Sequence, residues 1–355
     1  MTLDLSKYRR QIALKSFGLD KQSKLIESKV LIVGIGGLGI PVAQYLNAMG
    51  VGRLGLMDSD TIALHNLHRQ VLYSEQEVGR QKVEVAAEKL KKQNTQTEII
   101  SIPKYLTREN AIEVVSEYDL VVDASDNFAT RYLINDACVI LNIPFIYGAL
   151  HDFEGQVSVF NYKNGPTYRC LFPKIPKANE IPNCDENGVL GVLPGIIGNL
   201  QALEAIKVLT EVGEVLSGKL FIFDGLTQRN QLVQFKGNPD NKKLTELQEN
   251  YGFGLCETLQ GISIDDFLHL GGEKQLIDVR SETEFDSNHL EMATNIPLQE
   301  LDDNLDKIDL SIPVFLICQS GKRSAIAAQR LSELSPGSII YNIQGGMDQI
   351  SAVWH

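Results

Sequence analysis

Short apolar runs alternate with helical patterns over the first half of the chain. The predicted strands are residues 30–34, 54–58 and 120–123. The predicted helices, in which apolar side chains recur every three to four positions, are residues 38–49, 82–92 and 128–141. Strands that are apolar throughout are buried on both faces, and the intervening helices connect them in parallel. This pattern predicts an α/β fold with a mostly parallel sheet covered by helices on both faces.

The pattern changes after Pro144. Residues 156–162 alternate like an antiparallel strand, residues 196–209 return to a helical period, and residues 220–223 and 231–235 resemble a hairpin. These elements extend the first sheet, so we expect the first domain to occupy residues 1–236.

A second, smaller α/β pattern follows a polar stretch. Residues 237–260 are polar and weakly patterned, which is typical of a linker. Three strands and one helix then follow at residues 275–278, 314–318, 339–342 and 324–334. We therefore expect a second domain over residues 261–355.

Composition and charge narrow the functional classes. The 355 residues are 43% hydrophobic and 22% charged, which is enough to bury a core in each domain. The net charge of −12 argues against binding nucleic acid or an anionic membrane through a general positive field. No run approaches the ~18 apolar residues of a membrane span, and the start has no apolar signal core. We expect a cytoplasmic protein that binds neither membrane nor nucleic acid.

The first candidate site is a glycine-rich turn between a strand and a helix. Residues 30–39 read VLIVGIGGLG, with Gly34, Gly36 and Gly39 at the turn. Such glycines let backbone N–H groups approach a phosphate at the start of a helix. Asp58 ends the next strand, where a carboxylate can bind ribose hydroxyls. Taken alone, this fingerprint is most often that of an NAD or FAD site.

Charged residues beyond this turn favour different chemistry. Arg69 and Lys82 follow the second strand, and Asp126 follows the strand 120–123. Parallel strands bring these residues to one edge of the sheet. Cations there neutralise charge on a phosphate and a carboxylate holds Mg²⁺, as phosphoryl or adenylyl transfer requires and hydride transfer does not. The alternative is that Arg69 and Lys82 are solvated surface charges.

Five motifs in order resemble a known family. GIGGLG, the Asp58–Asp60 pair, NLHRQ, GRQK and SDN are similar to the ubiquitin-activating superfamily, in its MoeB/ThiF-like branch of molybdopterin-synthase and thiamine-biosynthesis adenylyltransferases. The resemblance covers residues 7–236 and implies a Rossmann-like domain. It also implies a homodimer that adenylates the C-terminal Gly-Gly carboxylate of a ubiquitin-like sulfur carrier (MoaD/ThiS-like). By this resemblance the ATP-binding residues are Gly34, Gly36, Gly37, Gly39, Asp58, Asn66, Arg69, Gln70, Lys82, Asp126 and Asn127.

The resemblance assigns two further roles. Asp126 serves the Mg²⁺ that accompanies ATP and the reacting phosphate. Arg10, in Tyr8-Arg9-Arg10-Gln11, matches a segment that reaches across the dimer into the partner's site.

One departure from the family concerns zinc. Family members usually bind a structural zinc through two Cys-x-x-Cys pairs. Here the corresponding positions are Thr167, Cys170, Asn241 and Leu244, so one thiol is left. Because a tetrahedral zinc site needs four nitrogen or sulfur ligands, we expect no zinc.

Cys184 lies in a polar segment, Ile181 to Gly188, that follows a proline-rich stretch. A loop cysteine is exposed, as reactivity requires, although Asp185 and Glu186 beside it raise its pKa. In the resembling family this position carries the cysteine that links covalently to the carrier. An inert loop thiol remains the alternative.

The second candidate site is Cys318, at the end of a strand and before a helix. The loop Cys318–Arg323 places the thiol at a helix N-terminus beside Lys322 and Arg323, features that stabilise a thiolate or a persulfide anion. Residues 261–355 resemble a rhodanese sulfurtransferase domain. The resemblance implies that Cys318 carries the sulfane sulfur, that the loop wraps it, and that Asp278 and Arg280 support the loop.

The two sites together predict one reaction sequence. ATP activates the carrier carboxylate, and a persulfide on Cys318, loaded by a donor such as a cysteine desulfurase, converts it into a thiocarboxylate for molybdopterin or thiamine biosynthesis. One alternative is a ubiquitin-like activator that uses a Cys184 thioester, with a rhodanese domain that only docks. Another is a nucleotide-dependent oxidoreductase, and a third is a scaffold without turnover.

Overall fold

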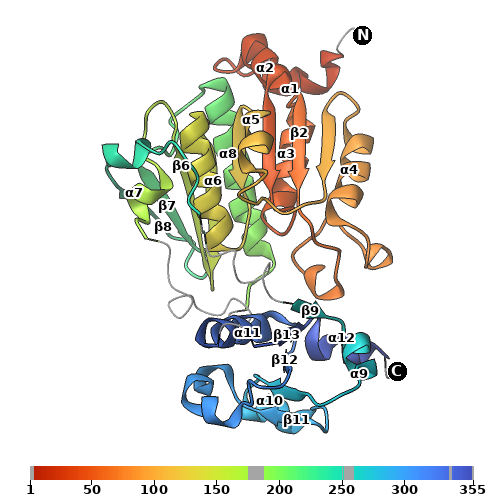
Figure 1. Ribbon diagram of the computed structural model, residues 1–355. Coiled ribbons are helices and arrows are strands. Elements are labelled where there is room, and N and C mark those ends of the chain that lie inside the picture. Colours follow the sequence, from red (N-terminus) through yellow and green to blue (C-terminus); the bar gives the residue numbers. More distant parts are fainter. Residues whose placement is uncertain (1–3, 175–187, 250, 252–259, 336–337, 354–355) are drawn as a thin grey trace. The chain divides into compact units, whose positions relative to one another are not determined.

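The computed structural model describes residues 4–174, 188–249, 251, 260–335 and 338–353. The chain forms two compact units, Met1–Tyr251 and Gly252–His355, each with its own sheet and core. Figure 1 shows the elements of each unit in chain order.

An eight-stranded sheet forms the centre of the first unit. Its order is β3-β2-β1-β4-β5-β6-β7-β8, parallel from β3 to β5 and antiparallel from β5 to β8. The bounds are β1 Lys29–Val33, β2 Arg53–Met57, β3 Glu98–Ile102, β4 Leu120–Asp123, β5 Phe145–His151, β6 Glu154–Phe160, β7 Lys219–Asp224 and β8 Asn230–Gln234. The prediction of a mostly parallel sheet is confirmed.

The register of the parallel strands brings the candidate residues to one edge. Val33 pairs with Met57 of β2 and with Asp123 of β4, so the three strands end side by side. The glycine turn, Asp58 and the loop that carries Asp126 therefore leave the sheet at the same edge, where ligands bind in such folds.

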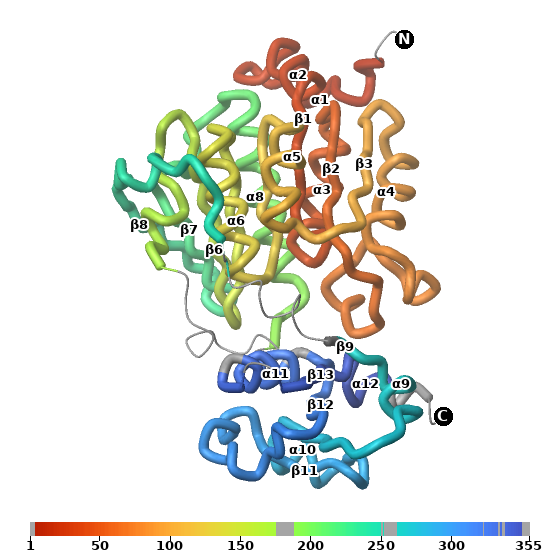
Figure 2. Tube along the Cα trace, in the orientation of Figure 1, coloured from red at the N-terminus to blue at the C-terminus, as the bar shows by residue number. Residues whose placement is uncertain are grey.

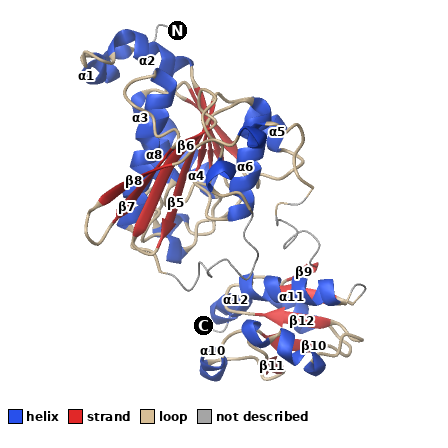
Figure 3. Ribbon diagram, turned by 90° about the vertical axis from the view of Figure 1, so that its left-hand side faces the viewer, coloured by secondary structure: helices blue, strands red, loops and turns tan. Residues whose placement is uncertain are grey.

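Helices cover both faces of this sheet (Figure 3), with α3 and α8 on one face and α5 and α6 on the other. The bounds are α1 Arg9–Ile12, α2 Gly18–Glu27, α3 Gly39–Met49, α4 Lys82–Gln93, α5 Ala111–Ser116, α6 Phe128–Leu141, α7 Tyr168–Leu171 and α8 Val192–Thr210. The core between helices and sheet is built from residues such as Ile32, Leu46, Leu56 and Ile197, all fully buried.

Helix α8 differs from the prediction at its start. It begins at Val192 rather than Ile196, because Pro194 lies in the first turn, where a missing backbone N–H costs nothing. Among the described helices, α8 alone is long and apolar enough to cross a membrane by length and composition. Its most apolar window is 56% buried inside the protein, so packing against the sheet accounts for that composition.

Part of the segment expected as a linker packs on the first unit. Residues 239–242 form a short 3-10 helix, and Tyr251 is 1% exposed. The Tyr251 hydroxyl donates to Asp136 Oδ2 at 2.8 Å, and Arg169 binds the same carboxylate at 2.7 and 2.8 Å. The first part of the expected linker 237–260 therefore belongs to unit 1, which ends at Tyr251. The polar composition of the segment did not predict this packing, because a single buried tyrosine, Tyr251, anchors the segment.

The second unit contains a five-stranded parallel sheet. Its order is β11-β10-β12-β13-β9. The bounds are β9 Gln260–Ile262, β10 Gln275–Asp278, β11 Ala293–Asn295, β12 Val314–Ile317, β13 Ile340–Ile343, α9 Ile264–His269, α10 Glu282–Ser287, α11 Lys322–Leu334 and α12 Gly346–Val353. The tube in Figure 2 traces β12 into the loop before α11. Gly321, at φ +88°, makes the tight turn into this helix, which begins two residues before the predicted Ser324.

Candidate functional site

The glycine turn after β1 has no room for side chains at two positions. A Cβ on Gly34, which has φ +94°, would lie 2.6 Å from the Ala124 carbonyl oxygen, and one on Gly39 would lie 1.9 Å from the Gly34 carbonyl oxygen. Close packing of β1, the β4 loop and α3 therefore requires glycine here. A Cβ on Gly36 would meet only the Gln70 amide nitrogen, at 3.4 Å, so the turn is open on that side.

Gln70 faces this open side of the turn. Its side chain is 3% exposed, and its Oε1 has no hydrogen-bond partner among the described residues. A buried acceptor without a partner costs stability unless a ligand or water supplies a donor. The donors of a nucleotide, an adenine amine or ribose hydroxyls, fit this requirement. Gly37 lies beside Pro194 of α8 and the Arg69 carbonyl oxygen, so the predicted NLHRQ segment and the turn do converge.

Asp58, Asp60 and Lys82 form a charged cluster after β2. Asp58 accepts hydrogen bonds from the backbone N–H groups of Ile35, at 2.8 Å, and Asp60, at 2.9 Å. Lys82 Nζ lies 2.7 Å from Asp60 Oδ2 and 3.9 Å from Asp58 Oδ2. Burial raises the pKa of Asp58, an effect that Lys82 opposes. The structure thus holds a buried ammonium at the edge where phosphates would bind.

Arg69 lies on the segment after the short 3-10 helix Leu64–Asn66. Its Nη1 lies 2.7 Å from His68 Nε2 and donates to the His65 carbonyl oxygen at 3.2 Å. These contacts hold the guanidinium against its own segment. Asn66 is 7% exposed and lies within the same segment.

The loop after β4 presents Asp126 and begins α6. Asp123 Oδ1 accepts from the backbone N–H of Ser125, at 3.0 Å, and from its hydroxyl, at 2.6 Å, which fixes the loop. Asp126 is exposed beyond it. Asn127 is the N-cap of α6, with its Oδ1 accepting from the Thr130 N–H at 2.8 Å. Asn127 therefore has a structural role that the resemblance did not indicate.

One predicted site residue, Arg10, lies apart from this edge. Arg10 is exposed on α1, where the neighbouring Gln11 side chain donates to the Met49 carbonyl oxygen just before β2, at the opposite end of the parallel strands. Cys184 lies outside the described residues.

Cys170, the one thiol at the four positions that the resemblance assigns to a zinc site, is hydrogen-bonded. Its Sγ lies 3.4 Å from the Thr167 N–H donor, 3.2 Å from the Asn238 N–H donor and 3.4 Å from Asn241 Nδ2. These bonds lower the pKa of Cys170 against the opposing effect of burial, which is the largest single contribution. Within the described ranges no group of three or more His, Cys, Asp or Glu residues could hold a metal ion. The residues present do not fit a four-ligand zinc site.

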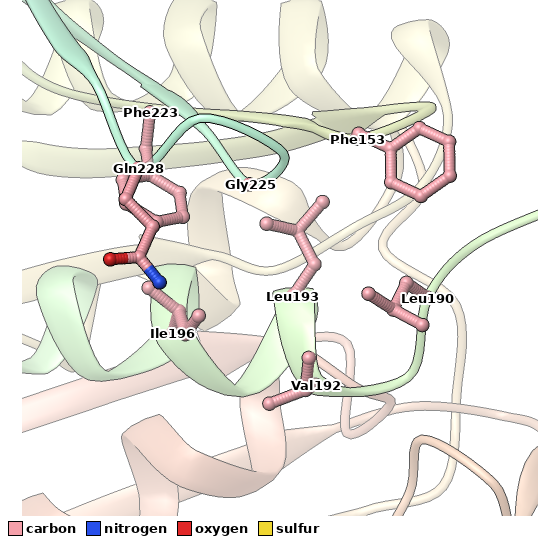
Figure 4. Close-up of a pocket in the computed structure, with 8 residues that line it drawn as sticks. All are labelled: Phe153, Leu190, Val192, Leu193, Ile196, Phe223, Gly225 and Gln228. Atoms are coloured by element: carbon pink, nitrogen blue, oxygen red, sulfur yellow. The ribbon is translucent and has the colours of Figure 1, made fainter.

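An apolar hollow lies at the start of α8 (Figure 4). Its lining comes from α8 and the residues before it, the β5–β6 turn and the β7–β8 hairpin: Phe153, Leu190, Val192, Leu193, Ile196, Phe223, Gly225 and Gln228. Leu190 and Val192 are 53% and 62% exposed. Between them, Gly191 packs against the His68 carbonyl oxygen, where a Cβ would come within 2.2 Å. The hollow therefore adjoins the segment that carries Arg69.

In the second unit, Cys318 lies at the end of β12. Its Sγ accepts a hydrogen bond from the Gly321 N–H at 3.2 Å and from the Ser324 hydroxyl at 3.3 Å. The residue is 0% exposed, so the surrounding loop and helix enclose the thiol. The expected cradle of backbone and helix N-terminus around this sulfur is present.

Two guanidinium groups brace the loop, each paired with a carboxylate. Arg280 Nη2 contacts Asp278 Oδ2 at 2.7 Å, and its Nη1 donates to Gln319 Oε1 at 3.1 Å. Arg323 donates to both oxygens of Glu284, at 2.6 and 2.8 Å. Glu284 was not predicted from the sequence. The Ser281-x-x-Glu284 spacing, a capping box at the start of α10, was the signal that marked it as ordered.

The fold and these sites define an adenylating enzyme of the ThiF type joined to a sulfurtransferase domain. The ThiF family matches residues 8–245, and the rhodanese-like domain matches residues 263–352. The chain belongs to the ThiF family and carries a C-terminal rhodanese domain.

Its relatives combine the same two parts. The chain is 40% identical over 373 residues to the adenylyltransferase and sulfurtransferase MOCS3 of Drosophila yakuba, covering 97% of this chain and 82% of that protein. It is 39% identical over 359 residues to MOCS3 of Aedes aegypti, with 93% and 82% covered. Among solved structures, E. coli MccB with ATP is similar at a TM-score of 0.59 and 25% identity, over 66% of this chain and 73% of that chain.

Proposed function

We propose that this protein adenylates the C-terminal Gly-Gly carboxylate of a ubiquitin-like sulfur carrier with ATP, and then transfers sulfur from a Cys318 persulfide to give a thiocarboxylate. The observation that carries the proposal is one chain with two sites: a glycine turn beside a buried lysine, and a cysteine cradled at a helix N-terminus. The relatives named adenylyltransferase and sulfurtransferase support it.

In the first step, a carboxylate oxygen of the carrier attacks the α-phosphorus of ATP and pyrophosphate leaves. The enzyme supplies no nucleophile for this step. Lys82 and Arg69 neutralise charge that develops on the phosphates, and Gln70 and Asp58 bind the nucleoside part. Asp126 would hold Mg²⁺, which supplies further neutralisation of the phosphate oxygens when bound.

In the second step, the persulfide anion on Cys318 attacks the acyl-adenylate carbonyl and AMP leaves. The product is an acyl disulfide between the carrier and Cys318. A second thiolate, which we assign to Cys184, attacks the Cys318 sulfur, and the thiocarboxylate leaves with the electron pair of the broken S–S bond. The resulting protein disulfide is reduced by a cellular dithiol before the next turnover.

Two partners besides the carrier follow from this scheme. A persulfide donor such as a cysteine desulfurase reloads Cys318. A second copy of the chain completes each adenylation site with Arg10, which is exposed on α1 and so available to a partner. The exposed side chains Leu14, Leu19, Tyr45 and Leu203, at 52% to 58%, support a homodimer because α1, α2, α3 and α8 lie close together.

The apolar hollow at the start of α8 is the surface we assign to the folded part of the carrier. It adjoins the Arg69 segment through Gly191, so a carrier seated there would have its C-terminal tail near the glycine turn. Exposed aliphatic side chains beside a polar site are typical of a docking surface.

Pyrophosphate exchange tests the adenylation step directly. With the purified carrier present, labelled pyrophosphate should enter ATP, and this exchange needs no sulfur donor. A scaffold or an oxidoreductase gives no exchange. An activator that works only through a Cys184 thioester gives exchange but forms no thiocarboxylate when a persulfide donor is added.

A further inference from the structure

The ion pair between Glu284 and Arg323 is the feature of the second unit that the proposed chemistry does not use. Glu284 lies on α10, and Arg323 is the second residue of α11, directly after the turn that cradles Cys318. Both guanidinium Nη atoms donate to the carboxylate, at 2.8 and 2.6 Å. Arg323, which the sequence analysis expects to stabilise an anion on Cys318, is thus already paired with a carboxylate.

The carboxylate in this pair stays charged over the physiological range. The hydrogen bond from Arg323 lowers the pKa of Glu284 to about 2. The other guanidinium at the loop, that of Arg280, is likewise paired, with Asp278. Each arginine that braces the loop is therefore matched by a carboxylate within hydrogen-bond distance.

This pairing bears on which sulfur donors the site accepts. Thiosulfate is a dianion and needs cations at the loop. The persulfide group of a thiol persulfide has at most one negative charge, on its outer sulfur. A bidentate carboxylate competes with an incoming anion for the same donors. The charge pattern therefore disfavours small dianions while leaving the backbone cradle of Cys318 intact.

We propose that Glu284 is a specificity-determining residue of the sulfurtransferase site: by pairing with Arg323 it disfavours thiosulfate and so selects a persulfide as the sulfur donor. The inference rests on the proposed function, because it assumes that Cys318 carries sulfane sulfur. In loading from thiosulfate, the Cys318 thiolate attacks the outer sulfur, the new S–S bond forms, and sulfite leaves with the electron pair. In loading from a persulfide, the donor thiolate leaves instead.

The test compares the two donors in the full-length protein. Cyanide accepts the sulfane sulfur, and thiocyanate formation gives kcat/KM for thiosulfate and for cysteine persulfide. In Glu284→Gln, kcat/KM for thiosulfate should rise roughly tenfold, a fraction of what one preorganised charge contact contributes. The value for cysteine persulfide should change no more than in the control Glu282→Gln, which removes an exposed carboxylate from the same helix.

Glutamine preserves the fold of α10, because its amide oxygen can accept from Ser281 as Glu284 does now, at 2.9 and 3.0 Å. Glu284→Ala provides a second variant and should raise the thiosulfate value in the same direction. Adding Arg323→Gln to Glu284→Gln should remove the gain, since the freed guanidinium produces it. Lys322 is unchanged in all of these proteins, so its charge cancels in the comparison.

A thiosulfate kcat/KM in Glu284→Gln that equals that of Glu282→Gln, or falls below it, overturns the inference while the proposed function stands. Failure of the wild-type protein to transfer sulfur from either donor through Cys318 overturns the sulfurtransferase function itself, and the inference with it.

Discussion

Lys82 and Asp60 form an ion pair of 2.7 Å at the carboxyl edge of the first sheet. The lysine side chain is 6% exposed and the aspartate 52%, so the ammonium is fixed by the fold while its partner borders solvent. Asp58, 3.9 Å away, adds a second carboxylate and is itself fixed by two backbone N–H groups. A buried cation held in this way needs little rearrangement to meet a phosphate, which is the condition for electrostatic catalysis.

Replacement of this cation should abolish adenylation. We expect Lys82→Ala to lower carrier-dependent pyrophosphate exchange by about 10²–10³, the usual effect of losing one preorganised charge contact. Asp126→Ala should cause a comparable loss, because Mg²⁺ would lose a ligand. Lys91→Ala, on the exposed end of α4, is the matched control and should exchange normally. Near-normal exchange in both site variants would mean that the adenylation site lies elsewhere.

The role of Arg10 can be tested by mixing subunits. Arg10→Ala and Lys82→Ala homodimers should each be inactive in adenylation. If Arg10 acts in the partner's site, a heterodimer of the two has one complete site out of two, so each heterodimer formed by subunit exchange should have about half the activity of a wild-type dimer. Absence of any recovery, with heterodimer formation verified by differently tagged subunits, would place Arg10 within its own subunit's site or outside catalysis.

The metal content should differ from that of zinc-binding family members. Cys170 Sγ is bound by the N–H groups of Thr167 and Asn238 and by the Asn241 amide, in place of three further thiolates. Elemental analysis of the protein, after removal of any affinity tag, should find no stoichiometric zinc. A chelator should leave the melting temperature unchanged. One zinc per chain would show that the ligands lie among other residues.

Carrier docking at the apolar hollow predicts a selective defect. Val192→Lys places a charge on the hollow and should raise the KM for the carrier about tenfold or more, because an anchor at the centre of an interface contributes over ~1.4 kcal/mol. The KM for ATP should not change. Ile100→Lys, on the edge strand β3, is the control and should leave both constants unaltered. Equal effects on carrier and ATP would indicate a general loss of structure instead.

The sequence predicted the sheet of the first unit because its strands are buried on both faces. The apolar runs at 30–34, 54–58 and 120–123 correspond to β1, β2 and β4 within one residue at each end. Edge strand β3 escaped detection because polar residues interrupt its apolar run, as at Glu98 and Ser101. The placement of the glycine turn and Asp58 at one edge of the sheet was predictable, because each directly follows one of two parallel strands.

Side-chain pairing across the chain was not predictable. Arg323 and Glu284 are 39 residues apart in sequence, and nothing in the spacing indicates that they meet. The same holds for Lys82 and Asp60, whose pairing depends on how β2 and α4 pack. By contrast, the capping role of Asn127 was available from local sequence, since asparagine directly before a helical pattern favours an N-cap.

The most direct test of the account is the product formed without Cys318. Cys318→Ala, incubated with ATP, the carrier and a persulfide donor, should form carrier adenylate at the wild-type rate, because no thiol takes part in that step. Cys170→Ala serves as the matched cysteine control and should still make the thiocarboxylate. Intact-mass measurement of the carrier decides the question. The account predicts no exchange of oxygen for sulfur in Cys318→Ala, and a carrier thiocarboxylate made by that variant would contradict it.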